Sequence, residues 1–188
     1  MKEIEILVEL YTDIDICKQI FKKFNFIGTN HVIDYYYYDP LRSNLKPNQN
    51  YELNECFRLR KKDNKNYITY KVDHFNDKNV WLYSDEYETQ VEDIKMLEKI
   101  IKSLGLKELI IINNKKTIYT FENYEIVLEE VENLGKFMEV EYCTGKDVDI
   151  KKVKEEIQSF IDSLDLEVSS ELHMGKPEMM IRKMTNYQ

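Results

Sequence analysis

Two arginines stand two positions apart, at Arg58 and Arg60, in the segment 54–73, which reads as two β-strands joined by a polar turn. Successive side chains point to opposite faces of a strand. Arg58, Arg60 and Lys71 therefore share one face, while apolar residues cover the other. A guanidinium group is a planar fork that can bond phosphate oxygens bidentately. The hairpin thus presents either a phosphate-binding surface or an ordinary solvated face, which is the default for half-buried antiparallel strands.

Carboxylates repeat this alternation on other predicted strands, again opposite apolar neighbours. In an open sheet these charged faces would meet water, whereas in a closed barrel they would share one lumen. Buried charge is tolerated only when it is paired or metal-bound. The set contains carboxylates but no His or Cys, which favours Mg²⁺ or Mn²⁺ as the metal. The basic groups suit a polyanion, so a metal-bridged triphosphate would satisfy both kinds of charge. The set comprises the acidic Glu3, Glu5, Glu86, Glu88, Glu129, Glu139 and Glu141 and the basic Arg58, Arg60, Lys71 and Lys116.

The elements that must position these groups are mostly strands. Strands are predicted over 2–11, 29–39, 54–73 (a hairpin), 80–91, two parts of 106–121, and 124–143 (a second hairpin). Helices are predicted after Thr12 or Asp13, over 93–104, and after Asp147 or Asp149, with Gly28 beyond the end of the first helix. The sum of about eight strands, mostly joined as antiparallel hairpins, and three helices favours a barrel-like α+β domain.

Length and composition set further limits. The 188 residues fit a single domain, 1–188, whose tail, 173–188, is expected to be a short helix or disordered. A net charge of −8 argues against nucleic-acid binding, which needs a basic footprint. Three widely spaced cysteines without a CxxC pair, no signal peptide and no apolar run of about 20 residues predict a reduced, cytoplasmic protein without a membrane partner.

The ordered set of motifs resembles the CYTH family, the triphosphate tunnel enzymes that include class IV adenylate cyclases and thiamine triphosphatases. The similarity runs from residue 2 to about residue 172. Two motifs depart from the family pattern, because Leu7 stands where the opening ExExK has lysine and Asn114 stands at a basic position. The matching residues are Glu3 and Glu5, Asp34, the hairpin residues Arg58, Arg60, Lys61, Thr69 and Lys71, the acidic Glu86 and Glu88, and the segment 129–141 with its LGxFxExE pattern.

The resemblance implies an α+β fold, a closed antiparallel eight-stranded β-barrel with helices packed outside. Its tunnel is expected to bind a triphosphate with Mg²⁺ or Mn²⁺. The resemblance also implies that Arg58, Arg60, Lys71 and Lys116 grip the triphosphate, and it leaves Glu86 and Glu88 as additional tunnel acids. The departures at Leu7 and Asn114 remove two positive charges, each worth roughly 1.5–3 kcal/mol in a charge-assisted contact. The implied metal ligands are Glu3, Glu5, Glu129, Glu139 and Glu141.

Three activities follow from this resemblance. The leading interpretation is a class IV adenylate cyclase that converts ATP to cyclic AMP and pyrophosphate, because the tyrosine-rich strand 29–39 and the acidic strand 80–91 most resemble that branch. The runner-up is a triphosphatase acting on thiamine triphosphate or inorganic tripolyphosphate. The third is a non-catalytic protein that binds a phosphorylated metabolite. The sequence leaves open the substrate, the metal, the catalytic residues and whether the chain forms a homodimer.

Overall fold

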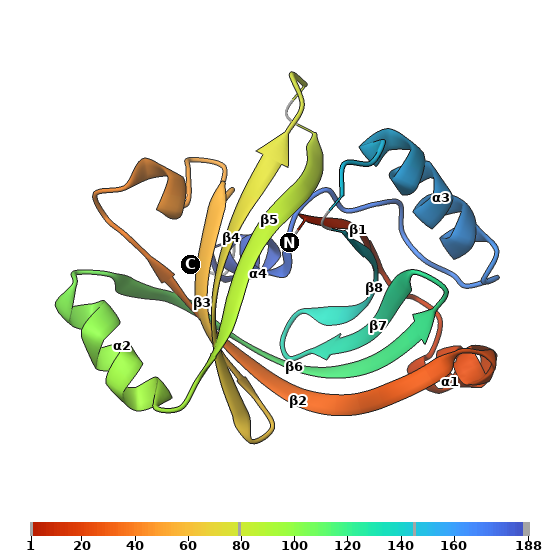
Figure 1. Ribbon diagram of the computed structural model, residues 1–188, viewed down its shortest axis with the longest axis horizontal. Coiled ribbons are helices and arrows are strands. Elements are labelled where there is room, and N and C mark those ends of the chain that lie inside the picture. The colour runs from red at the N-terminus through yellow and green to blue at the C-terminus, as the bar shows by residue number, and fades with distance from the viewer. Residues whose placement is uncertain (1, 79, 145, 186–188) are drawn as a thin grey trace.

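Eight antiparallel strands close into a barrel in the computed structural model, which describes residues 2–78, 80–144 and 146–185 (Figure 1). The strands are β1 (Lys2–Glu9), β2 (Asn25–Tyr38), β3 (Glu55–Lys62), β4 (Lys65–Phe75), β5 (Trp81–Val91), β6 (Lys107–Phe121), β7 (Tyr124–Val131) and β8 (Gly135–Thr144). Around the barrel they follow the order β1–β5–β4–β3–β2–β6–β7–β8, and β8 pairs with β1 to complete the ring. The predicted fold class is therefore confirmed.

Two helices cover the outer face of β1, β7 and β8. They are α1 (Ile14–Ile20), capped by Asp13, and α3 (Ile150–Asp162), capped by Asp149. Their apolar stripes pack on the outward side chains of the strands, and Ile157 of α3 is fully buried there. Burying these alternating apolar side chains under the helices leaves the opposite, charged side chains directed inward.

A third helix, α2 (Ile94–Ser103), covers the outer face elsewhere on the barrel. Asp93 caps it by accepting a hydrogen bond from the backbone N–H of Met96. Its buried Ile94 and Ile101 pack with Leu59 of β3 and Tyr37 of β2. The outer layer thus holds β2 and β3 in place, and with them the inward-facing arginines of β3.

Two boundaries differ from the sequence predictions. Gly28 does not stop the first helix but lies inside β2, because α1 ends at Ile20, a short 3₁₀ turn follows at Phe21–Lys23, and the strand begins at Asn25. The segment 106–121 does not form two strand-like parts but one continuous strand, β6. Its polar middle is held in the sheet because Asn113 pairs across to β2 and Lys115 pairs with both β2 and β7.

The C-terminal tail contains a helix, α4 (Lys176–Thr185), so the described residues form four α-helices rather than three. Pro177 stands in its first turn, where proline is well tolerated. Unlike α1 to α3, α4 does not cover the outer face: its Met180 and Ile181 pack with the inward-facing Leu7 and Ile112. In Figure 1 the helix is seen between β4 and β1. Residues 186–188 of the predicted tail lie outside the described residues.

None of the helices in the described part of the chain is long and apolar enough to cross a membrane.

Candidate functional site

The charged faces of the strands meet in one cavity of about 480 Å³ inside the barrel. This volume falls within the range of small-molecule sites, about 300–1,000 Å³. Glu129 is fully buried beside the cavity and is ion-paired to a lining lysine, Lys116. The other predicted site residues all line the cavity: Glu3, Glu5, Arg58, Arg60, Lys71, Glu86, Glu88, Lys116, Glu139 and Glu141.

Strand register explains why these side chains meet. In a non-bulged antiparallel pair, residues directly opposite each other point to the same side of the sheet. Glu5 of β1 lies opposite Glu141 of β8, and Lys71 of β4 lies opposite Glu86 of β5. Pairs of this kind bring charged side chains from neighbouring strands together on the inner face of the barrel.

Arg60 is committed to a structural ion pair with Asp34 of β2. Its Nε lies 2.7 Å from Asp34 Oδ1, and its terminal nitrogen lies 2.8 Å from Oδ2, so the contact is bidentate. Burial alone would raise the pKa of Asp34, but the positive charges of Arg60 and Arg58 hold it well below its usual range. Two of the guanidinium donors of Arg60 are thus already used within the protein.

Arg58 is held much more loosely. Its terminal nitrogens lie 3.4 Å from the hydroxyl of Tyr36, 3.6 Å from Glu86 and 3.9 Å from Glu88. Its Nε is buried and has no hydrogen-bond partner among residues 2–78, 80–144 and 146–185. A buried donor without a partner carries a desolvation cost that an incoming acceptor would remove. Arg58 is therefore the arginine best placed to receive an anion.

The two lysines predicted to grip a triphosphate currently contact carboxylates. Lys71 Nζ lies 3.0 Å from Glu3 and 3.6 Å from Glu5. Lys116 Nζ lies 2.8 Å from Glu129 and 3.8 Å from Glu139. Burial lowers the pKa of Lys71, but Glu5 and Glu3 more than offset this, so the pKa lies well above its usual value and the group stays charged.

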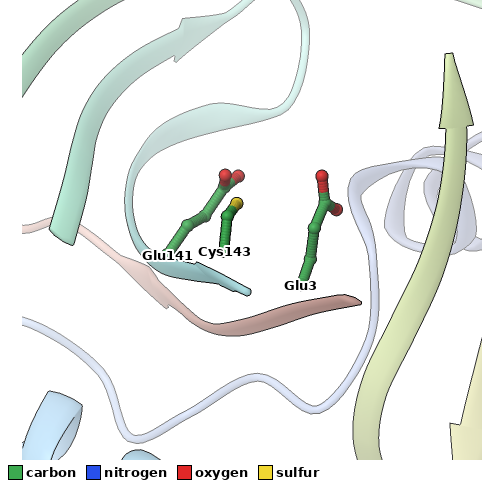
Figure 2. A group of neighbouring side chains, drawn as sticks. All are labelled: Glu3, Glu141 and Cys143. Carbon is green, nitrogen blue, oxygen red and sulfur yellow. The ribbon is translucent and has the colours of Figure 1, made fainter. Parts of the chain in front are cut away.

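Carboxylates gather at two overlapping positions in the cavity. In the first, ligand atoms of Glu5, Glu139 and Glu141 all lie within 4.8 Å of one another. In the second, Glu141 is grouped with Glu3 and Cys143. Figure 2 shows Glu3 on β1 and the other two on β8, with all three side chains directed to the same side of the strands. Either group could hold a metal ion.

The electrostatics of these carboxylates fit a divalent cation. Burial and the negative charges of Glu139, Glu5 and Glu3 raise the pKa of Glu141 well above its usual range. Burial also raises the pKa of Glu5, to about 7, in spite of Lys71 nearby. No lysine or arginine nitrogen lies within 4.0 Å of Glu141 among the described residues. A cation at this point would relieve the crowding, and carboxylate oxygens are ligands that Mg²⁺ and Mn²⁺ accept.

Several charged residues that line the cavity were missed by the sequence predictions, among them Lys176 at the start of α4. The others are Glu52, Lys62, Asp73, Glu125, Glu178 and Arg182. Lys176 Nζ lies 2.9 Å from Glu129 Oε1 and 3.2 Å from both oxygens of Glu139. The tail shows no clear helical period, so nothing in it placed a helix inside the barrel. The available signal was the Gly175-Lys176-Pro177 step, since Pro commonly begins a helix.

Comparison with known proteins finds similarity in sequence and in structure. A Methanocaldococcus jannaschii protein, whose name gives adenylate cyclase as a proposed activity, is 30% identical over 115 residues. The match covers 61% of this chain and 65% of that relative, a little under two thirds of its length.

Two solved structures extend the likeness over nearly the whole chain. One, from Pyrococcus horikoshii, is 25% identical with a TM-score of 0.78 and covers 95% of this chain and 99% of its own. Another, from Hippeastrum, is described as a candidate adenylyl cyclase with a dominant triphosphatase activity. It is 14% identical with a TM-score of 0.63, covers 98% and 96% of the two chains, and so shows a shared fold. The CYTH domain matches residues 1–173. With the barrel and its ionic lining, this match establishes that the chain belongs to the CYTH domain family.

Proposed function

We propose that this protein binds a metal-bridged triphosphate inside the barrel and converts it. One observation carries the proposal: basic groups with spare hydrogen-bonding capacity and a crowded carboxylate cluster face the same cavity of about 480 Å³. Basic groups alone would suit any anion, and carboxylates alone would suit any hard cation. Together they suit a polyphosphate chain whose charge is partly neutralised by a divalent ion.

The proposal gives each side of the cavity its own role. Arg58, Lys71 and Lys116 bind phosphate oxygens. Arg60 holds Asp34 in place and adds to the positive electrostatic potential in the cavity. Mg²⁺ or Mn²⁺, when bound, neutralises charge on the phosphates and lowers the pKa of the attacking hydroxyl or water. Glu86 and Glu88 keep Arg58 extended into the cavity through their long contacts. The proposed ion ligands are Glu3, Glu5, Glu129, Glu139 and Glu141.

For the reaction, adenylate cyclase is the leading candidate. In that reaction the ribose 3′ oxygen of ATP forms a bond to the α-phosphorus and loses its proton. The bond from the α-phosphorus to the bridging oxygen breaks, and pyrophosphate leaves. The name of the 30% identical Methanocaldococcus jannaschii relative supports this candidate. We assign no residue as the proton acceptor.

Triphosphate hydrolysis is the second candidate, with water attacking the terminal phosphorus. The shared barrel of the Hippeastrum protein, which is described as mainly a triphosphatase, motivates it. The third candidate is binding without turnover. The replacement of two expected basic residues by Leu7 and Asn114 motivates that one, because fewer cations are left to stabilise the charge that develops during phosphoryl transfer.

One experiment separates the three candidates. The purified protein is incubated with ATP, thiamine triphosphate or tripolyphosphate, each with Mg²⁺ or Mn²⁺, and the products are resolved by ion-exchange chromatography. Cyclic AMP with equimolar pyrophosphate indicates the cyclase, and orthophosphate indicates the hydrolase. A triphosphate that stays bound to the protein without being converted indicates the binding protein. Glu141→Gln serves as the control, since it removes a proposed ion ligand and should abolish any turnover. Absence of both turnover and binding would refute the proposal.

A further inference from the structure

Strand β5 has a neighbouring strand along its whole length on only one side. On that side β4 pairs with it from one end to the other. On the other side β1 pairs with it only at Ser84 and Asp85, which lie opposite Glu3 and Lys2. Within the part of the chain that the structure describes, no strand pairs with this second side of β5 over residues 87–91. In Figure 1 β5 runs downward from its contact with β1 towards α2.

The C-terminal tail accounts for this open edge, because it occupies the place beside β1 that β5 leaves. The backbone N–H of Leu172 donates to the carbonyl of Leu7 at 3.0 Å, and that of Ser169 donates to the carbonyl of Glu9 at 3.0 Å. Strand β8 pairs with the opposite side of β1 along its whole length, so these two carbonyls face the side on which β5 begins. Strand β5 therefore diverges from β1, and its residues 87–90 are exposed.

The open edge of β5 lacks most of the features that protect exposed strands against further pairing. Such strands usually carry Lys or Pro, contain a bulge, or are covered by a loop. Residues 87–91 are Tyr, Glu, Thr, Gln and Val, and their pairing with β4 runs without a register shift. Tyr87, on the outer side of the strand, is 62% exposed. Every second residue of this segment thus directs its backbone N–H and C=O away from β4, where another strand could bind them.

The inner side of the same segment is acidic. Glu88 lines the cavity and its side chain is 32% exposed, so it lies at the cavity rim. Among the described residues, the nearest lysine or arginine nitrogen belongs to Arg58, 3.9 Å away, and the hydroxyl of Thr69 donates to Glu88 at 2.7 Å. Carboxyl side chains also outnumber lysine and arginine along the cavity wall. A strand added here is attracted if its inward side chains are positive and repelled if they are negative.

We propose that residues 87–91 are a docking site for an extended basic segment of a partner protein, which adds to the sheet as a further strand beside β5. In this mode of recognition main-chain hydrogen bonds provide affinity, and alternate side chains provide specificity. The partner segment carries lysine or arginine at every second position, facing Glu88 and the acidic rim of the cavity. Between them it carries aromatic or β-branched residues, which pack beside Tyr87 on the outer side.

The test follows the backbone amide signals of the whole chain by NMR while a short peptide is added in which lysine and valine alternate. A peptide with glutamate in place of lysine is the control. We expect the lysine peptide to shift the signals of residues 87–91 and to slow hydrogen exchange at alternate amides of that segment. At a peptide concentration ten times its Kd, exchange at these amides should be about tenfold slower. The glutamate peptide should have neither effect.

A pair of variants tests the role of the charge. Glu88→Gln should weaken binding of the lysine peptide by about two- to fivefold, which is the effect of losing a partly exposed ion pair. The matched control is Glu108→Gln, since Glu108 is an exposed carboxylate on β6 that does not line the cavity. This control should bind the peptide as the wild type does. Equal weakening in the two variants would overturn the role of Glu88.

Three results with the wild type would overturn the proposal, even if Glu88→Gln failed to fold. The first is no binding of the lysine peptide, or binding that leaves exchange at residues 87–91 unchanged. The second is equal binding of the glutamate peptide. The third is protection of these amides in the free protein that grows with protein concentration, because the edge would then pair with a second copy of this chain. The test contains no triphosphate, so its outcome is independent of the proposed function.

Discussion

Arg58 and Arg60 stand two residues apart on one strand, yet the structure predicts opposite consequences for removing them. Arg60 makes a bidentate pair with a carboxylate whose side chain is only 3% exposed. Removing one partner of a buried ion pair costs roughly 3–5 kcal/mol, because the other charge is left uncompensated. Arg60→Met should therefore lower the free energy of unfolding by about that amount.

Arg58 has no comparable partner. Its contacts to Glu86 and Glu88 are 3.6 and 3.9 Å long, and Met can keep the packing of its apolar stem. Contacts this long are weak, so Arg58→Met should cost about 1 kcal/mol of stability or less. If its free donors bind phosphate, the same change should weaken tripolyphosphate binding by roughly 1.5–3 kcal/mol, which is about 10- to 150-fold in Kd.

The assay measures both quantities on the same proteins: urea unfolding for stability and calorimetry with tripolyphosphate and Mg²⁺ for affinity. Asp34→Asn combined with Arg60→Met is the control, since it removes both charges of the pair and should recover much of the stability lost in Arg60→Met. The reasoning is refuted if Arg58→Met loses as much stability as Arg60→Met while it binds tripolyphosphate as tightly as the wild type.

Three further predictions follow from the carboxylate cluster and the packing around it. In the metal-free protein Glu5 and Glu141 bind protons more tightly in the folded state than in the unfolded state, so the free energy of unfolding should fall as pH rises from about 4.3 towards 7. In urea unfolding, Mn²⁺ should then stabilise the protein more at pH 7.5 than at pH 5, and equal stabilisation at the two pH values would contradict this. Leu7→Lys should destabilise the protein by about 2 kcal/mol in urea unfolding by disrupting the contact with α4, and an unchanged free energy of unfolding would contradict this. Ile157→Ala should cost roughly 2–5 kcal/mol because Ile157 is fully buried under α3, while the Kd for tripolyphosphate stays unchanged because the cavity lies on the other side of the sheet.

The sequence was sufficient to predict the strands and most of the cavity lining because alternation is a local property, whereas the closure of the barrel was predicted from the resemblance to a family. On β1 the two-residue period separates Glu3 and Glu5 from Ile4 and Ile6, and the structure buries the second pair under helices and turns the first pair into the cavity. Local rules failed where tertiary pairing outweighed them. The polar run in the middle of β6 looks like a turn, but pairing with strands on both sides keeps it extended.

The position of Lys176 could not be predicted for a different reason. A lysine at the start of a short helix is usually solvated, and only the packing of Met180 and Ile181 against the inward-facing Leu7 shows that this helix belongs to the cavity wall. Likewise, the RxR spacing predicts two equivalent arginines, yet the buried carboxylate of Asp34 opposite Arg60 makes them unequal. Such differences depend on which distant residue lies across the barrel.

The most direct test of the account is a crystal structure of the protein grown with Mn²⁺ and a non-hydrolysable ATP analogue. We predict an anomalous Mn²⁺ signal between Glu5, Glu139 and Glu141, and triphosphate density that reaches from this ion to the Nε of Arg58. A structure with the analogue bound on the outer face of the barrel, or with Mn²⁺ held away from these carboxylates, would contradict it.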